Sequence, residues 1–235
     1  MRKSLAYLFI LSSICARAYA QEFESSLREY DLIGFRSLGA GAAVNLFEPR
    51  SDNALPDSMA IKFSSPTFFL EYRQMNIRLA VAYNHYSLRD AGKSSYAIYA
   101  DGSTDVPVAV KRSGGLFLPI FLATNYVRAE GLGNSSGIFD VGSIGIGTGL
   151  KYRFLSERFG LQISGGALIH YATVGFSIEN GTSTAWRGEV QFLLPELLWN
   201  GVTIGYRIDE QQWRMSEAKY NYKRLQHGAF VGLLF

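Results

Sequence analysis

The chain has 235 residues, of which 24 are Gly and 14% are aromatic, and Lys and Arg outnumber Asp and Glu by 23 to 20. The surplus consists of Arg2, Lys3 and Arg17, which lie within the first 20 residues, where no acid occurs. Residues 21–235 therefore carry 20 charges of each sign, which argues against a nucleic-acid-binding surface. The one cysteine, Cys15, also precedes residue 21, so the rest of the chain forms no disulfide.

The N-terminal residues have the pattern of a secretory signal peptide. Two basic residues precede a short apolar stretch, residues 5–14, and Ala18 and Ala20 are the small residues that a signal peptidase requires. The apolar stretch is too short for a membrane-spanning helix. We therefore predict a cleaved signal peptide over residues 1–20, followed by a charged periplasmic lead-in over residues 21–34.

The remaining residues, 35–235, repeatedly alternate apolar with polar or small side chains. Residues 142–154 show this most clearly, because their even positions from 144 onward are apolar apart from Thr148 and their odd positions are small or basic. A strand of a soluble β-sandwich alternates in the same way, with its apolar side inward. Alternation over about 9–11 residues is, however, the length that a tilted membrane strand needs. A sheet crosses a membrane only as a closed barrel, so the pattern predicts a transmembrane β-barrel.

Ten segments follow this pattern and favour a meander in which each strand pairs with the next. Residues 96–111 alternate least clearly, which leaves eight strands as the alternative to ten. The predicted fold is an all-β, antiparallel, up-and-down transmembrane barrel over residues 35–235. Its predicted strands are 38–47, 68–73, 77–84, 96–111, 116–126, 142–154, 159–164, 186–194, 202–209 and 227–235.

The connections between these segments alternate in length and polarity, which predicts their sides of the membrane. The shorter connections are expected in the periplasm, near residues 74–76, 112–115, 155–158 and 195–200. The longer and more polar ones are expected outside the cell, near residues 48–57, 89–95, 128–137, 179–183 and 215–220.

The last nine residues alternate again and end on an aromatic side chain. His227, Ala229, Val231, Leu233 and Phe235 share one face of this strand. This ending resembles the C-terminal strand of bacterial outer-membrane β-barrel proteins. The resemblance implies an outer-membrane location, contact with the lipid bilayer and lipopolysaccharide, and an assembly signal at Val231, Leu233 and Phe235 that the barrel assembly machinery reads.

Residues 116–122, which lead to Tyr126, are also similar to a strand of the small barrels grouped as "outer membrane protein beta-barrel domain". Within this segment, Pro119 has no backbone N–H to donate to a neighbouring strand. We therefore predict a kink or a bulge at this position.

If the apolar side of each strand faces lipid, the other side fills the lumen with charged and polar residues. A barrel of eight to ten strands has an interior hardly wider than its side chains, so charges of both signs are expected to pair there. The sequence favours a polar, largely plugged lumen over a narrow, porin-like channel or ligand-binding lumen. The predicted lumenal set is Glu71, Arg73, Arg78, Lys151, Arg153, Gln162, Arg187, Glu189, Arg207, Asp209, Arg224 and Gln226.

No segment carries a strong catalytic, metal-binding or cofactor-binding motif. The glycines of residues 145–149 fall on one strand face with no helix after them, which favours close packing over nucleotide binding. His85 and Ser87 have the spacing used by outer-membrane lipid A 3-O-deacylases, but the surrounding residues differ and no partner Glu can be assigned. His85 with Asp90 is a weak match to an omptin-type protease, and His170 has no acid or nucleophile beside it in sequence.

We therefore predict a non-enzymatic, integral outer-membrane protein without metal or cofactor, in a structural role or in recognition through its extracellular loops. Two alternatives remain open at this point. One is a narrow channel or transporter for small solutes, and the other is a lipid-modifying enzyme.

Overall fold

The structure, a computed structural model, describes residues 36–56, 60–74, 76–88, 93–111, 113–130, 138–156, 158–175, 179–197 and 200–235, without the side chains of 86–88 and 93–95. The predicted signal peptide and lead-in lie outside these residues. The described chain forms ten strands and one 3-10 turn, η2 (Ala218–Tyr220). The strands are β1 (Arg36–Pro49), β2 (Phe63–Gln74), β3 (Ile77–Leu88), β4 (Lys93–Lys111), β5 (Gly114–Glu130), β6 (Ile138–Leu155), β7 (Gly160–Val174), β8 (Asn180–Leu194), β9 (Val202–Met215) and β10 (Tyr222–Leu234).

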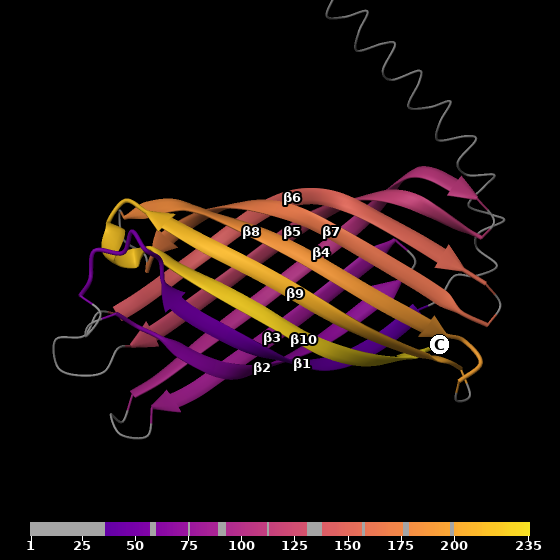
Figure 1. Cartoon of the computed structure of the whole chain (residues 1–235), viewed down its shortest axis with the longest axis horizontal. Helices are drawn as coiled ribbons and strands as arrows, with labels where there is room; N and C mark the ends of the chain where they lie inside the picture. The colour runs from indigo at the N-terminus through magenta and orange to yellow at the C-terminus, as the bar shows by residue number, and fades with distance from the viewer. Residues whose placement is uncertain are drawn as a thin grey trace, which may run out of the picture.

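The ten strands form a closed barrel (Figure 1). Every strand pairs antiparallel with its neighbour in sequence, and β1 closes the barrel by pairing with β10 from Ser37 opposite Leu234 to Pro49 opposite Tyr222. Closure gives every strand a neighbour on both sides, as a sheet surrounded by lipid requires. The predicted up-and-down barrel is thus confirmed, and ten strands rather than eight is the correct number. No helix in the described part of the chain is long and apolar enough to span a membrane.

The two ends of the barrel differ in their connections. The connections β2–β3, β4–β5, β6–β7 and β8–β9 lie at one end, here called the turn end, together with the start of β1 and the last residue, Phe235. The other connections lie at the opposite end, here called the loop end, which includes η2. This division reproduces the predicted alternation, although the connection between β7 and β8 ends before Asn180.

Outside the barrel, exposed apolar side chains form a belt. Leu70, Leu79, Ile146, Ile169 and Trp186 are all more than half exposed, as are apolar residues of other strands. A soluble protein would bury so much apolar surface, whereas lipid covers it in a membrane-spanning barrel. Towards the loop end the outward positions become charged, and these residues form a collar at Glu48, Arg128, Asp140, Glu210, Arg214 and Lys223.

One irregularity occurs in β4. The pairing of β4 with β5 shifts by one residue between Pro107 and Ala109, so Val108 is a bulge. The irregularity predicted at Pro119 on β5 takes a different form, because Pro119 pairs in register with Asp105 of β4. On its other side, the ladder to β6 is interrupted at Pro119, and the Thr148 hydroxyl donates to the Pro119 carbonyl at 3.0 Å. Proline therefore removes ladder bonds without shifting the strand.

Candidate functional site: the interior of the barrel

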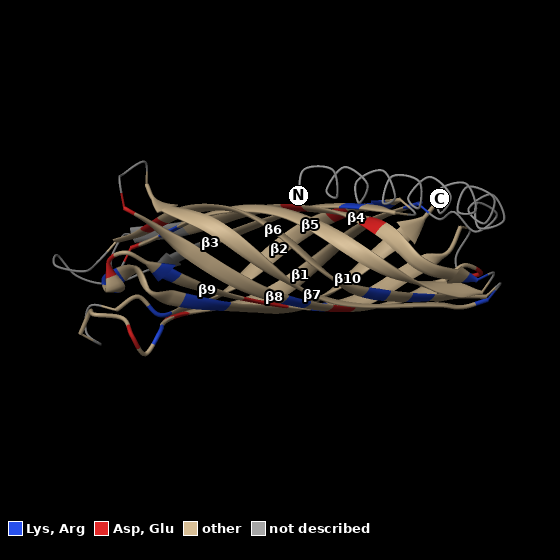
Figure 2. Ribbon diagram, turned by 90° about the horizontal axis from the view of Figure 1, so that it is seen from above, with Lys and Arg blue, Asp and Glu red and all other residues tan. Residues whose placement is uncertain are grey.

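The predicted lumenal side chains lie inside the barrel. Nine of them are buried, with exposed fractions between 2% and 7%: Glu71, Arg73, Arg78, Lys151, Arg153, Gln162, Glu189, Asp209 and Arg224. Arg187, Arg207 and Gln226 are partly buried and line an internal cavity. Figure 2 marks charged positions along the strands as well as in the loops. The structure therefore brings all twelve residues to one side of the sheet.

A network of ion pairs crosses the middle of the interior. Arg73 of β2 reaches Glu189 of β8, with 2.6 Å between Nη2 and Oε1. Arg207 of β9 donates from Nε to Glu189 at 2.9 Å and also contacts Glu71 of β2. Arg78 of β3 donates to Glu71 at 2.9 Å. Strands β2 and β3 lie across the barrel from β8 and β9, so the pairs Arg73–Glu189 and Arg207–Glu71 connect opposite walls.

A second group of charges lies nearer the turn end. Lys151 of β6 donates to both carboxylate oxygens of Asp105 on β4, each at 2.7 Å. Arg153 lies 3.4 Å from the same carboxylate and donates from Nε to the side-chain oxygen of Gln162 at 3.2 Å. Gln162 donates in turn to Gln191 at 3.3 Å. Such buried charges are tolerated because each has an opposite charge and further hydrogen bonds.

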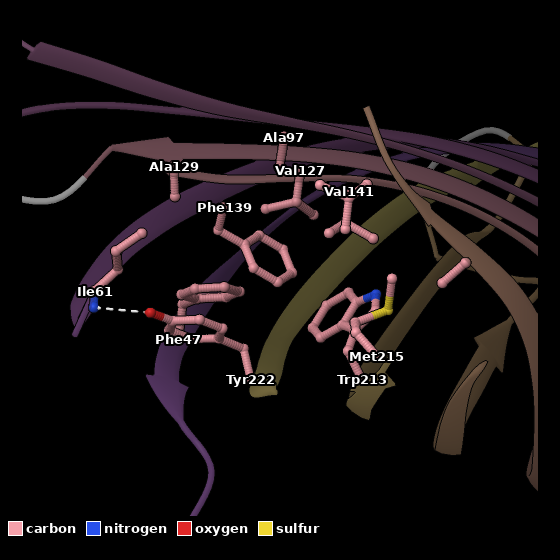
Figure 3. Packing of buried hydrophobic residues seen from close by; sticks show 12 residues of the cluster. Phe47, Ile61, Ala97, Val127, Ala129, Phe139, Val141, Trp213, Met215 and Tyr222 are labelled. Carbon is pink, nitrogen blue, oxygen red and sulfur yellow. Dashed lines mark hydrogen bonds between the residues drawn. The ribbon is translucent and has the colours of Figure 1, made fainter. Parts of the chain in front are cut away.

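Apolar clusters lie at both ends of this polar interior. At the loop end, Phe47, Phe139, Trp213 and Tyr222 pack on one another, with Phe47 and Tyr222 stacked at 4.9 Å between ring centroids (Figure 3). The backbone N–H of Ile61 donates to the Tyr222 hydroxyl at 3.1 Å, which satisfies the buried phenol. We call this group the aromatic cluster. At the turn end, a smaller cluster contains Leu155, Leu193 and Leu234, with Val110 packed against it.

A cavity of about 50 Å³ is lined by part of the central network and by smaller residues. Its polar lining includes Tyr99, Asn125, His170, Gln211 and Arg224. His170 is 2% exposed. Its ring packs directly against Gly145, because a Cβ added to residue 145 would lie only 2.2 Å from the ring. Gly145 thus provides the space that His170 occupies.

Sequence reasoning missed two lumenal carboxylates. Asp101 and Asp105 of β4 bind Arg78 and Lys151 respectively, but β4 was the least distinct predicted strand. The outward-facing residues next to these acids are Gly102 and Thr104. Neither is a large apolar residue, so the sequence here does not alternate between apolar and polar side chains. The available signal was that Asp101, Ser103 and Asp105 share one parity.

The inward-facing aromatic residues were also missed, because the prediction assigned apolar residues to lipid. Phe69 is 5% exposed and Phe139 is fully buried inside the barrel. Phe69 lies in the middle of the lumen, with 5.0 Å between its ring centroid and the guanidinium carbon of Arg207, so apolar side chains also pack among the central charges.

The two remaining histidines lie on the outside. His227 of β10 contacts the Tyr206 hydroxyl of β9, with 2.9 Å between Nδ1 and the oxygen, so a polar atom on the apolar belt has a partner. His85 is exposed on the outer side of β3 and stacks on Tyr83 at 6.5 Å. The side chain of Ser87 and all of Asp90 lie outside the described residues. Within the described ranges, no group of three His, Cys, Asp or Glu residues could hold a metal ion.

The residues of the predicted assembly signal face outward at the turn end. Val231, Leu233 and Phe235 are 53%, 59% and 60% exposed, so all three lie on the lipid side of the sheet. The N–H of Phe235 donates to the carbonyl of Arg36 at 3.0 Å, which keeps the last residue beside β1.

No protein-family model matches the chain, and neither does any curated protein. Solved structures with a similar arrangement include the outer membrane protease OmpT of Escherichia coli, with 8% identity, 86% of this chain and 97% of that chain covered, and a TM-score of 0.41. The attachment invasion locus protein Ail of Yersinia pestis has 11% sequence identity, with 86% of this chain and 99% of that chain covered, and a TM-score of 0.31. Neisserial surface protein A (NspA) has 17% sequence identity, with 85% of this chain and 97% of that chain covered, and a TM-score of 0.33.

Proposed function

We propose that this protein is an integral outer-membrane barrel with a closed lumen, which acts as a structural or recognition component through its loop end. The central observation is the set of ion pairs that connect opposite walls, such as Arg73 with Glu189 and Arg187 with Asp101. Apolar clusters lie on either side of this network along the barrel. A solute that crosses the lumen would therefore meet packed side chains three times: at the aromatic cluster, at the ion-pair network and at the apolar cluster of the turn end.

Opening such a lumen carries a large energetic cost. Removing one partner from a buried ion pair typically costs about 3–5 kcal/mol, because the other charge is left without compensation. Glu71 contacts Arg73, Arg78 and Arg207 at once. Moving this one carboxylate aside would therefore disturb several pairs together, which favours a closed barrel over a channel.

Planar-bilayer recording tests the closed lumen directly. Purified barrel is added to the bilayer, and insertion is verified by recovering protein from the membrane. We expect no reproducible conductance steps across a range of salt concentrations. Discrete steps of constant size would contradict the proposal and favour the narrow channel. A protein-free detergent addition provides the blank.

The loop end offers a suitable surface for recognition because some of its connections are held together. Arg50 donates to the Gln212 side chain at 2.7 Å, and Asn53 donates to the carbonyls of Lys219 and Asn221 at 3.1 and 2.9 Å. The loop that follows β1 is thus fastened to the loop between β9 and β10. A preordered surface loses less conformational entropy on binding than a flexible one.

The location proposed for this barrel is the bacterial outer membrane, with the loop end outside and the turn end in the periplasm. Export would use the signal peptide of residues 1–20, and assembly would use Val231, Leu233 and Phe235 as recognised by the barrel assembly machinery. Lipid and lipopolysaccharide would surround the belt and the charged collar. Intact-mass measurement of protein from outer membranes tests the export step, with an N-terminus at Gln21 expected and an uncleaved N-terminus as the contrary result.

A further inference from the structure

The cavity described above is walled by unusually small residues. Its lining includes Ala43, Ala80, Ala123, Ala185 and Gly228. These residues come from strands all around the barrel, so the space arises from several separate positions rather than from one truncated side chain. A volume of about 50 Å³ is enough for roughly three to five water molecules, at 10–15 Å³ for each. It is also enough for one small ion with two to five heavy atoms.

Three residues that line this cavity carry nitrogen atoms without a hydrogen-bond partner among the described residues. These atoms are Nδ1 of His170, Nη1 of Arg187, and both Nε and Nη1 of Arg224. The residues His170 and Arg224 are 2% and 4% exposed. An unsatisfied buried polar group costs about 1–3 kcal/mol, and a charged one costs more. Such groups in one cavity indicate an occupant that accepts hydrogen bonds.

The charges around the cavity indicate the sign of that occupant. Arg187, Arg207 and Arg224 line it, against two carboxylates, Asp101 and Asp209. Both Arg187 and Arg224 bind Asp209, and Arg187 also binds Asp101. The third arginine, Arg207, binds Glu71 and Glu189, which also bind Arg73 and Arg78. Every carboxylate is therefore shared between arginines, and the central group around the cavity holds five arginines against four carboxylates, which leaves one positive charge.

The described barrel interior as a whole has the same imbalance. It holds seven basic and five acidic side chains, which leaves two positive charges inside a wall surrounded by an apolar belt. The basic residues are Arg73, Arg78, Lys151, Arg153, Arg187, Arg207 and Arg224, and the acids are Glu71, Asp101, Asp105, Glu189 and Asp209.

We propose that this cavity binds a small oxyanion, a carboxylate or phosphate of the size of acetate or inorganic phosphate. Arg187 and Arg224 donate to its oxygens from the nitrogens that lack a protein partner, in the charge-assisted geometry that guanidinium groups form with oxyanions. His170 donates or accepts through Nδ1, depending on its tautomer. This ion site is independent of the recognition role proposed for the loop end.

Thermal unfolding of the barrel refolded in detergent with each anion present tests the proposal. Refolding with the anion makes the result independent of any entry path. Acetate and inorganic phosphate are compared with citrate, which is too large for the cavity, at equal ionic strength. We expect the unfolding midpoint to rise and saturate with acetate or phosphate, as mass action requires for a ligand of the folded state. Citrate should have no saturable effect.

Variants identify the site. Ala123→Val adds two methyl groups inside the cavity while leaving every charged residue in place, and it should abolish or strongly reduce the anion-dependent shift. Ala229→Val makes the same change on the exposed outer side of β10 and should retain the shift. The proposal is overturned if no small anion raises the midpoint. It is equally overturned if citrate matches phosphate, or if Ala123→Val responds like the unaltered protein.

Discussion

Arg187 on β8 reaches across the barrel to Asp101 on β4, with 3.0 Å between Nη2 and Oδ2. The same carboxylate accepts a hydrogen bond from Nη1 of Arg78 at 2.5 Å. Asp101 thus joins two arginines from separate strands. Asp101→Asn keeps the shape of this side chain but removes its charge, so we expect the free energy of unfolding to fall by about 3–5 kcal/mol. Equilibrium urea unfolding in liposomes measures this change.

Asp140→Asn is the matched control for that substitution. Asp140 lies in the outer collar, 3.9 Å from Arg128, with its side chain 25% exposed. An ion pair of this kind contributes roughly 0–1 kcal/mol. Equal losses for the two variants would contradict a special role for the interior network.

The aromatic cluster should contribute more to stability than the aromatic residues of the belt. Trp213 is fully buried between Phe47 and Phe139, whereas Trp186 is 64% exposed on the lipid side. Trp213→Ala leaves a cavity inside the barrel and should cost about 3–5 kcal/mol. Trp186→Ala should cost much less, because lipid fills the vacated space. Urea unfolding compares the pair, and a larger loss at Trp186 would refute the assignment of inside and outside.

Cysteine labelling on intact cells determines which end faces outward. Cys15 is the only cysteine of the chain and lies in the predicted signal peptide, so one introduced thiol would be the only one in a chain that has been cleaved as proposed. Lys219→Cys at the loop end should react with a membrane-impermeant maleimide. Glu196→Cys at the turn end, also exposed, should react only after the cells are lysed. The reverse result would invert the proposed orientation.

A carboxyl pair at the loop end should respond to pH. A hydrogen bond with Glu217 raises the pKa of Glu179, while the same bond and Lys219 lower the pKa of Glu217. The contact is therefore favoured while Glu179 is protonated, and it is lost as the pH rises through the raised pKa of Glu179. Carbon-13 NMR of the side-chain carboxyls in micelles should give a Glu179 midpoint above the ordinary Glu value. Glu217→Gln should lower it, and an unchanged midpoint would exclude the pair.

Much of the fold was predictable because a barrel strand has only two sides. Apolar and polar side chains alternate at residues 142–154 and 202–209, which indicates a strand with lipid on one side and the lumen on the other. The structure has strands at both places. Counting ten such segments was enough to predict a closed meander.

The contacts inside the barrel were not predictable in the same way. Which residues meet across the lumen depends on how the closed sheet is staggered, and no local pattern contains this information. The pair Arg73 and Glu189 comes from β2 and β8, which are far apart in sequence. The cavity depends likewise on small residues from several strands, each of which alone looks like ordinary close packing.

The bulge at Val108 has a consequence for how this chain tolerates changes in length. Before it, inward positions of β4 have odd numbers, as at Asp105, and after it Val110 packs inside the turn end. Deleting Val108 would move only the few residues up to the turn by one position. Deleting a residue of β4 before Asp101 would have one of two effects. Either the pairing of β4 with its neighbours would shift, or lumenal side chains would point to the lipid and lipid-facing ones to the lumen. β4 therefore has one place where its length can change and the two carboxylates keep their direction.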